Sequence, residues 1–249
     1  MNKKNIIIMI FVLLIISIIA WRIHSSETNQ APHYLILIDR SGSVVNIRGS
    51  VLGITDRVLK GKARPGSTLS ILATGDNQSS SNEAVFLGSF KVPIAQRMLE
   101  GRSKINHERD EIMRQVSDLC SNLKTSNYSP IFLGVKRGIE WLRSLGCANG
   151  NCTLFIASDA EENQEKMITR SLHSKRLTIA KLPTINAHDI QILFCGISET
   201  DGRRTRRTRN ALYVERLEQV WRSVLQTENL SFAPYCPKLK SSHQSDTME

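Results

Sequence analysis

The sequence predicts an α/β protein with a doubly wound, mainly parallel sheet flanked by helices. Short apolar runs that suit strands buried on both faces recur at residues 34–38, 68–74, 152–158 and 190–197. Apolar residues at helical spacing lie between and after these runs. Because parallel strands connected in this order need right-handed crossovers, we expect helices on both faces of the sheet.

The expected helices are defined by apolar stripes. Residues 164–181 are also expected to be helical, and residues 84–92 to form an edge strand or the hairpin partner of residues 68–74, across a turn rich in Gly, Asn and Ser. The stripes consist of Val51, Ile54, Val58 and Leu59; Ile112, Val116, Leu119 and Leu123; Val135, Ile139 and Leu142; and Tyr213, Leu217, Val220 and Val224.

The amino terminus predicts a single-pass membrane anchor. Residues 6–21 are apolar apart from Ser17, and a helix of this length rises roughly 24 Å, which a bilayer accommodates by local thinning. Lys3 and Lys4 favour a cytoplasmic amino terminus, with the remaining chain outside the cytoplasm, in a periplasm or at the cell surface. A cleaved signal peptide is the alternative, although residues 18–20 make a poor cleavage site.

These patterns divide the chain into four parts. Residues 1–25 are the expected anchor, residues 26–32 a short polar tether, residues 33–230 one globular domain and residues 231–249 a polar tail. The tether is brief, so the domain should lie close to the membrane surface.

A polar pentapeptide, DRSGS at residues 39–43, ends the first apolar run. In open α/β sheets, ligands bind at the carboxyl edge of the strands. Asp39, Ser41 and Ser43 alternate, so a turning loop can point one carboxylate and two hydroxyls at one spot. Hard oxygen ligands of this kind suit Mg²⁺ or Mn²⁺. An ordinary turn, which these residue types also favour, is the alternative.

The DRSGS sequence resembles the DxSxS motif of the von Willebrand factor A domain, where it is the first element of a metal-ion-dependent adhesion site. In that family a Thr or Ser at the start of a later helix and an Asp after the next buried strand complete the site. Ser129 and Asp159 match these positions in order. The resemblance covers roughly His33 to Leu230 and implies a Rossmann-like fold.

The resemblance also implies the role of each site residue. Ser41, Ser43 and Ser129 would bind Mg²⁺ or Mn²⁺ directly, whereas Asp39 and Asp159 would engage it mainly through water. Such a site leaves a position for an Asp or Glu carboxylate of a protein partner. We therefore expect a metal-dependent adhesion or assembly module without enzymatic activity.

Ser129 and the residues that follow Asp159 also allow other interpretations. Ser129 followed by Pro130 is also typical of a helix N-cap with proline at the first helical position. Ala160 stands where the family generally has Gly, and the loss of easy positive φ predicts a different local loop. Glu161 and Glu162 could add ligands, or could simply be solvated.

The sequence motifs give little support for an enzyme. A hydrolase or phosphatase would have to use the loop of Asp39 and Ser41. A serine hydrolase needs a G-x-S-x-G elbow, which the chain lacks. A phosphatase acting through an aspartyl intermediate would carry DxDxT, but Ser41 replaces the second acid.

Basic residues exceed acidic ones, and the net charge is +10. Part of this charge lies in the run from Arg203 to Arg209. Such a run could bind acidic lipid headgroups or nucleic acid, or could be a solvated surface segment. Nucleic acid is the least favoured partner if the domain lies outside the cytoplasm.

Five cysteines leave an odd count. Cys147 and Cys152 bracket the turn sequence Ala-Asn-Gly-Asn, so we expect a small disulfide loop if the domain lies in an oxidising compartment. Cys195 is expected to be buried in a strand. Free thiols are the alternative, and the spacing does not suit a zinc site.

Overall fold

A computed structural model describes residues 17, 31–41, 46–61, 66–75, 84–93, 102–126, 129–147, 151–162, 165–173, 182–197 and 211–237. The chain separates into two compact units, residues 1–31 and 32–249, and the second contains nearly all of the described residues. Apart from Ser17, the expected anchor lies outside them, as do Ser43 and the run from Arg203 to Arg209. Within the described residues, no helix has the length and apolarity needed to cross a membrane.

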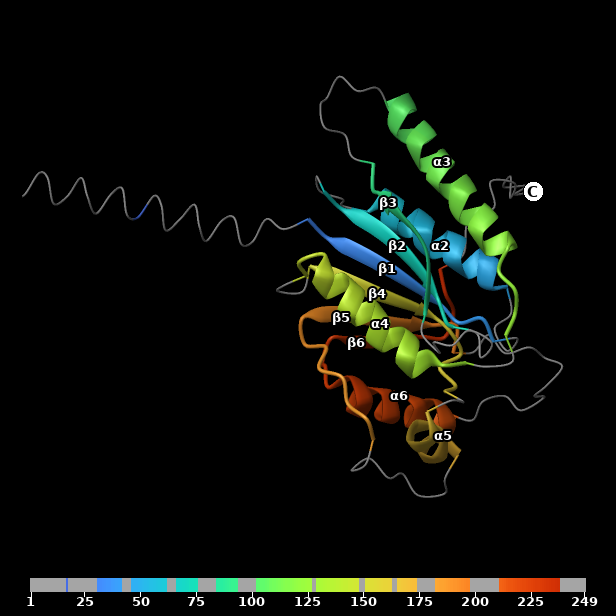
Figure 1. Ribbon diagram of the computed structural model, residues 1–249, viewed down its shortest axis with the longest axis vertical. Coiled ribbons are helices and arrows are strands. Elements are labelled where there is room, and N and C mark those ends of the chain that lie inside the picture. The colour runs from blue at the N-terminus through green and yellow to red at the C-terminus, as the bar shows by residue number, and fades with distance from the viewer. Residues whose placement is uncertain are drawn as a thin grey trace, which may run out of the picture. The chain divides into compact units, whose positions relative to one another are not determined.

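The structure confirms an α/β fold with a mostly parallel sheet (Figure 1). The strand order is β3-β2-β1-β4-β5-β6, with β3 antiparallel to β2 and every other pair parallel. The two central strands are fully buried along most of their length, as their continuous apolar sequences require. The strands are β1 (His33–Ile38), β2 (Thr68–Ala73), β3 (Val85–Lys91), β4 (Cys152–Ala157), β5 (Ile190–Cys195) and β6 (Leu230–Ala233).

Described helices cover both faces of the sheet (Figure 1). The helices α2 (Ile47–Lys60) and α3 (Arg102–Ser121) belong to the core on one face, which contains Ile36 and Ile38. The helices α4 (Ile131–Ser144), α5 (Lys166–His173) and α6 (Ala211–Leu225) belong to the core on the opposite face, which contains Leu35 and Leu37. Alternate residues of β1 therefore enter the two cores, as the pleat of a strand dictates.

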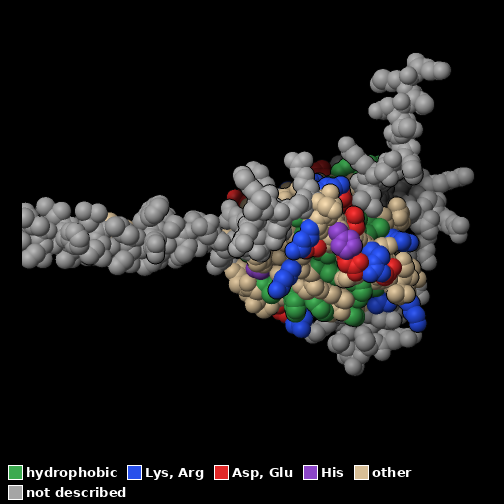
Figure 2. All heavy atoms as spheres, turned by 90° about the horizontal axis from the view of Figure 1, so that it is seen from above, with side chains coloured by type: hydrophobic (Ala, Val, Ile, Leu, Met, Phe, Trp, Pro, Cys, Tyr) green, Lys and Arg blue, Asp and Glu red, His purple; other side chains and the backbone are tan. Residues whose placement is uncertain are grey.

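The outer surface of the domain carries interspersed charges. Figure 2 shows basic and acidic side chains close together on the face that it views. On α3, for example, Arg114 forms ion pairs with Glu111 at 2.7 Å and with Asp118 at 3.8 Å. These pairs are exposed, so each contributes little to stability.

Helix α4 approaches β1 closely because two of its residues lack a side chain. A Cβ atom added at Gly134 would lie 3.1 Å from Leu37 Cδ2, and one added at Gly138 would lie 3.0 Å from Leu35 Cδ2. The two glycines are four residues apart and therefore share one face of the helix. This face rests directly on the leucine side chains of the central strand.

Several element boundaries differ from those expected from the sequence. The expected domain ended at Leu230, but β6 continues to Ala233 and pairs with β5. Helix α5 ends at His173, and most of the remaining predicted segment lies outside the described residues. The expectation for residues 84–92 is confirmed, because β3 is an antiparallel edge strand.

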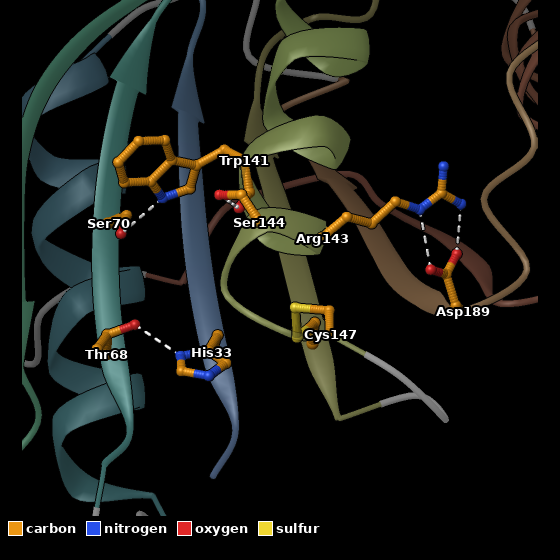
Figure 3. Close-up of a disulfide and its surroundings, with 9 residues drawn as sticks. His33, Thr68, Ser70, Trp141, Arg143, Ser144, Cys147 and Asp189 are labelled. Carbon is orange, nitrogen blue, oxygen red and sulfur yellow. Dashed lines mark hydrogen bonds and ion pairs between the residues drawn. A yellow bond between two sulfur atoms is a disulfide. The ribbon is translucent and has the colours of Figure 1, made fainter. Parts of the chain in front are cut away.

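Polar contacts and one disulfide join β1 to β2 and connect α4 and the segment after it to neighbouring parts of the domain (Figure 3). His33 Nδ1 and Thr68 Oγ1 lie 2.8 Å apart, which ties β1 to β2. The indole Nε1 of Trp141 donates to Ser70 Oγ at 3.1 Å. Arg143 binds Asp189 through two nitrogens and lowers the pKa of that carboxyl group by hydrogen bonding.

Candidate metal site

The described members of the expected site, Asp39, Ser41, Ser129 and Asp159, lie where the connections of the sheet change direction. Strands β1 and β4 are neighbours in the middle of the sheet, and their connections leave toward opposite sides. Such a switch point leaves a crevice at the carboxyl edge of the strands. Asp39 follows β1 directly and Asp159 follows β4 after one residue, so both acids lie at this edge.

Asp39 is at the centre of a buried hydrogen-bond network. Its Oδ1 accepts from the backbone N–H of Ser41 at 2.9 Å. Its Oδ2 accepts from the hydroxyls of Ser129 at 2.9 Å and Ser158 at 2.7 Å. Asp39 itself is 1% exposed, and its backbone N–H donates to Ala157 O at 3.0 Å. The network therefore fixes the carboxylate by three donors from three separate segments.

Asp39 and Asp159 are both buried, and it is unfavourable for both carboxyl groups to be ionised at the same time. Burial, followed by the charge of Asp159, raises the pKa of Asp39 to about 6. The hydrogen bonds from Ser41, Ser158 and Ser129 lower it but do not compensate. Two buried carboxylates of like charge favour protonation of one of them or the arrival of a cation.

Ser129 reaches the site through the segment that precedes α4. The Ser126 backbone N–H donates to Arg40 O at 2.8 Å, and Ser41 and Ser126 form an isolated parallel bridge. These contacts bring the Ser129 hydroxyl to Asp39. The interpretation of Ser129 as the N-cap is wrong, because Pro130 occupies the N-cap position of α4. The N-cap residue makes no side-chain hydrogen bond to the helix.

Glu162 caps α4 from another part of the chain. Its Oε2 accepts from the Phe132 backbone N–H at 2.6 Å, and its Oε1 accepts from the Glu165 backbone N–H at 3.0 Å. Glu162 is 1% exposed, so the interpretation as a solvated residue is wrong. Glu161 accepts from the Tyr213 hydroxyl at 3.0 Å, which ties the site loop to α6. Both glutamates thus have structural partners around the site.

The loop after β4 keeps a left-handed residue despite the absence of glycine. Ala160 has φ of 65°, so the expectation that Ala would change this conformation is wrong. Its backbone N–H donates to Ser158 Oγ at 2.9 Å, and its carbonyl accepts from Trp221 Nε1 at 3.0 Å. These two hydrogen bonds hold a conformation that costs an alanine roughly 1–2 kcal/mol.

Ser158 is a site residue that the sequence analysis missed. It was assigned to the end of a buried strand, although its hydroxyl binds Asp39 directly. Its position in the sequence could have identified it. A hydroxyl residue directly after a central strand lies at the same edge of the sheet as Asp39 and Asp159. Ser43, the fifth expected ligand, lies outside the described residues.

Two disulfides join the described cysteines. The expected pair, Cys147–Cys152, is confirmed, with 5.8 Å between the Cα atoms. A second pair, Cys195–Cys236, was not expected and links the end of β5 to the segment after β6. The remaining cysteine, Cys120, is buried, and burial raises the pKa of its thiol to about 11.

The donor set at the carboxyl edge fits a hard divalent cation. Ser41 and Ser129 offer neutral hydroxyl oxygens, and Asp39 and Asp159 offer negative charge in a buried setting. In the described part of the chain, no group of three or more His, Cys, Asp or Glu residues forms a conventional metal cluster. A cation here would therefore depend on the serine hydroxyls, which suit Mg²⁺ or Mn²⁺ better than zinc.

Comparisons with known proteins give no family for this chain. No known family profile matches it, and no curated protein matches its sequence.

Proposed function

We propose that the protein is a metal-dependent protein-binding module of the von Willebrand factor A type, which holds Mg²⁺ or Mn²⁺ and binds a carboxylate of a partner. The observation that carries the proposal is the meeting of Asp39, Ser129 and Asp159 at the switch point of the sheet. These residues come from three distant segments. An ordinary turn at DRSGS would not require that convergence.

The chemistry of the site supports binding without turnover. The hydroxyls of Ser41, Ser43 and Ser129 would hold the cation, and Asp39 and Asp159 would act mainly through water. Mg²⁺ prefers six oxygen ligands. A carboxylate from a partner would complete the set and add negative charge, so metal and partner would strengthen each other's binding.

The disulfides support a location outside the cytoplasm, because such bonds persist mainly in oxidising compartments. With residues 6–21 as an anchor, the domain would be held at a membrane surface. Protease added outside the inner membrane of intact cells should then degrade the domain. Protection until that membrane is lysed would reverse the orientation.

Calorimetric titration of Mg²⁺ and Mn²⁺ into the full chain in detergent tests the metal site. Wild type should bind, and sodium acetate as a carboxylate probe should tighten the binding. Asp39→Ala and Ser129→Ala should weaken it at least tenfold. Ser223→Ala is the matched control, because Ser223 is half-buried on α6, away from the site, and its hydroxyl donates to Gln219 O of the same helix.

Two outcomes would contradict the proposal. Equal binding by all of these proteins, or no binding by wild type even with acetate, would reduce DRSGS to a structural turn. Hydrolysis of a phosphate or ester probe that disappears in Ser41→Ala, while metal affinity persists, would indicate an enzyme instead.

A further inference from the structure

Ser158 connects the candidate metal site to the outer half of the sheet. Its hydroxyl donates to Asp39 Oδ2 at 2.7 Å, and its backbone N–H donates to Cys195 O at 3.1 Å. The side chain of Ser158 therefore contacts the site residue Asp39, and its backbone contacts the end of β5. The end of β5 is therefore one residue away from Asp39 through hydrogen bonds.

The end of β5 is itself held by the segment that follows β6. The Gly196 backbone N–H donates to Ala233 O at 3.3 Å, and Cys195 is bonded to Cys236. A Cβ added at Gly196 would lie 3.4 Å from Ser158 O and 3.7 Å from Cys236 Sγ. The carbonyl of Ser158 and the sulfur of Cys236 thus pack on the same glycine.

Strand β6 is short and, among the described strands, has a neighbour on one side only. It has four residues and lies at the edge of the sheet. Cys195 and Cys236 are 0% and 3% exposed, whereas the neighbouring Tyr235 is 58% exposed. A short edge strand followed by an exposed segment opens easily unless it is tied down.

We infer that the Cys195–Cys236 disulfide is a positioning element of the candidate metal site and makes its cation affinity depend on the redox state of this one pair. The inference rests on the proposed function for the cation, but the positioning of Ser158 is independent of it. Reduction by a dithiol would transfer two electrons and two protons, leaving two protein thiols and an oxidised reductant. The segment after β6 would then separate from β5, and Ser158 would lose its support.

The second disulfide is a natural control. Cys147–Cys152 closes a loop at the amino end of β4, the opposite end of the sheet from Asp39 (Figure 3). Its removal should also destabilise the fold, but it has no described contact with Ser158 or Asp39. A general loss of stability and a specific loss of positioning can therefore be separated.

The test compares full-length wild type, Cys195→Ala/Cys236→Ala and Cys147→Ala/Cys152→Ala in detergent, under oxidising conditions. Amide hydrogen exchange at Ser158 and Ala160, followed by mass spectrometry, should accelerate at least tenfold in the first variant and less than twofold in the second. Mg²⁺ affinity should fall about tenfold in the first and stay within twofold in the second. Dithiothreitol added to the second variant, which retains only Cys195–Cys236, should reproduce both effects.

If Cys195→Ala/Cys236→Ala does not fold, Gly196→Ala with both disulfides intact serves instead. It should produce the same local loosening, because Gly196 has φ of 96°, a backbone conformation that alanine adopts only at a cost. Equal exchange at Ser158 in the two double variants would overturn the positioning role. Absence of Mg²⁺ binding in wild type, with the exchange difference present, would instead contradict the proposed function alone.

Discussion

Asp39 and Asp159 follow neighbouring parallel strands, and both are 1% exposed. Because burial and the charge of Asp159 raise the pKa of Asp39 to about 6, the metal-free domain binds a proton there more tightly than the unfolded chain does. The contribution of Asp39 to stability is therefore fully present below about pH 4 and is lost as the pH rises to about 6.

We expect Asp39→Asn to stabilise the metal-free domain at pH 7.5, by up to about 3 kcal/mol. The amide keeps the shape of the protonated acid and removes the buried charge. Urea unfolding in EDTA at pH 4.5 and 7.5 measures the effect, which should shrink at the lower pH. Asp118→Asn on the exposed surface of α3 should change stability by less than about 0.5 kcal/mol at either pH. A destabilised Asp39→Asn at pH 7.5 would mean that the carboxylate is already compensated.

Cation binding should show the opposite pH dependence. A proton on Asp39 competes with the cation, and at pH 5 only about one tenth of a group with a pKa of about 6 is ionised. Mg²⁺ affinity should therefore be about tenfold weaker at pH 5 than at pH 7.5. Calorimetry at the two values checks this, and equal affinities would separate Asp39 from the bound cation.

Glu162 should matter for stability and not for the metal. Glu162→Ala removes the acceptor for the backbone N–H groups of Phe132 and Glu165 and should cost about 2–3 kcal/mol. Urea unfolding measures this cost. The matched control is Glu140→Ala, which removes an exposed acid paired with Arg137 and should cost less than about 1 kcal/mol. If Mg²⁺ affinity fell more than threefold with Glu162→Gln, the residue would be a ligand as well as a cap.

Replacement of Ala160 by glycine should stabilise the domain. At φ of 65°, glycine relieves the left-handed strain, and the expected gain is about 1 kcal/mol after its greater freedom in the unfolded chain is considered. Thermal unfolding measures the shift. Ala157→Gly, three residues earlier in β4, should destabilise because that position is extended and buried. Destabilisation by both changes would indicate that the Ala160 methyl group packs more favourably than the backbone strain costs.

Long periodic segments were predictable from the sequence, whereas short or distant pairings were not. The strand at residues 152–158 and the helical stripe of Val135, Ile139 and Leu142 have strong patterns, and both elements lie where expected. Strand β6 has four residues, too few for a periodic signal, so its pairing with β5 was missed. Because β6 was not predicted, Cys236 was expected to lie in a polar tail, and its disulfide bond to Cys195 was not predicted.

The sequence predicted which residues form the site, but it did not predict the hydrogen bonds between them. The residue types and order of Asp39, Ser129 and Asp159 placed them at one edge of the sheet. Their hydrogen bonds depend on the segment before α4 and on Glu162, which are positioned by tertiary contacts across 30 residues or more. Local propensity therefore favoured a helix cap at Ser129, and tertiary packing overrode it.

The contact of Gly134 and Gly138 with β1 offers a way to tune the site without changing a ligand. Both residues lie in the helix that begins two residues after Ser129, and Gly138 is about 10 Å along its axis from the first helical residue, Ile131. A methyl group at either position would have to displace α4 or the leucines beneath it. A change of volume in the apolar core would then alter the distance between Ser129 and Asp39, so the strength of cation binding could evolve through residues that never touch the ion.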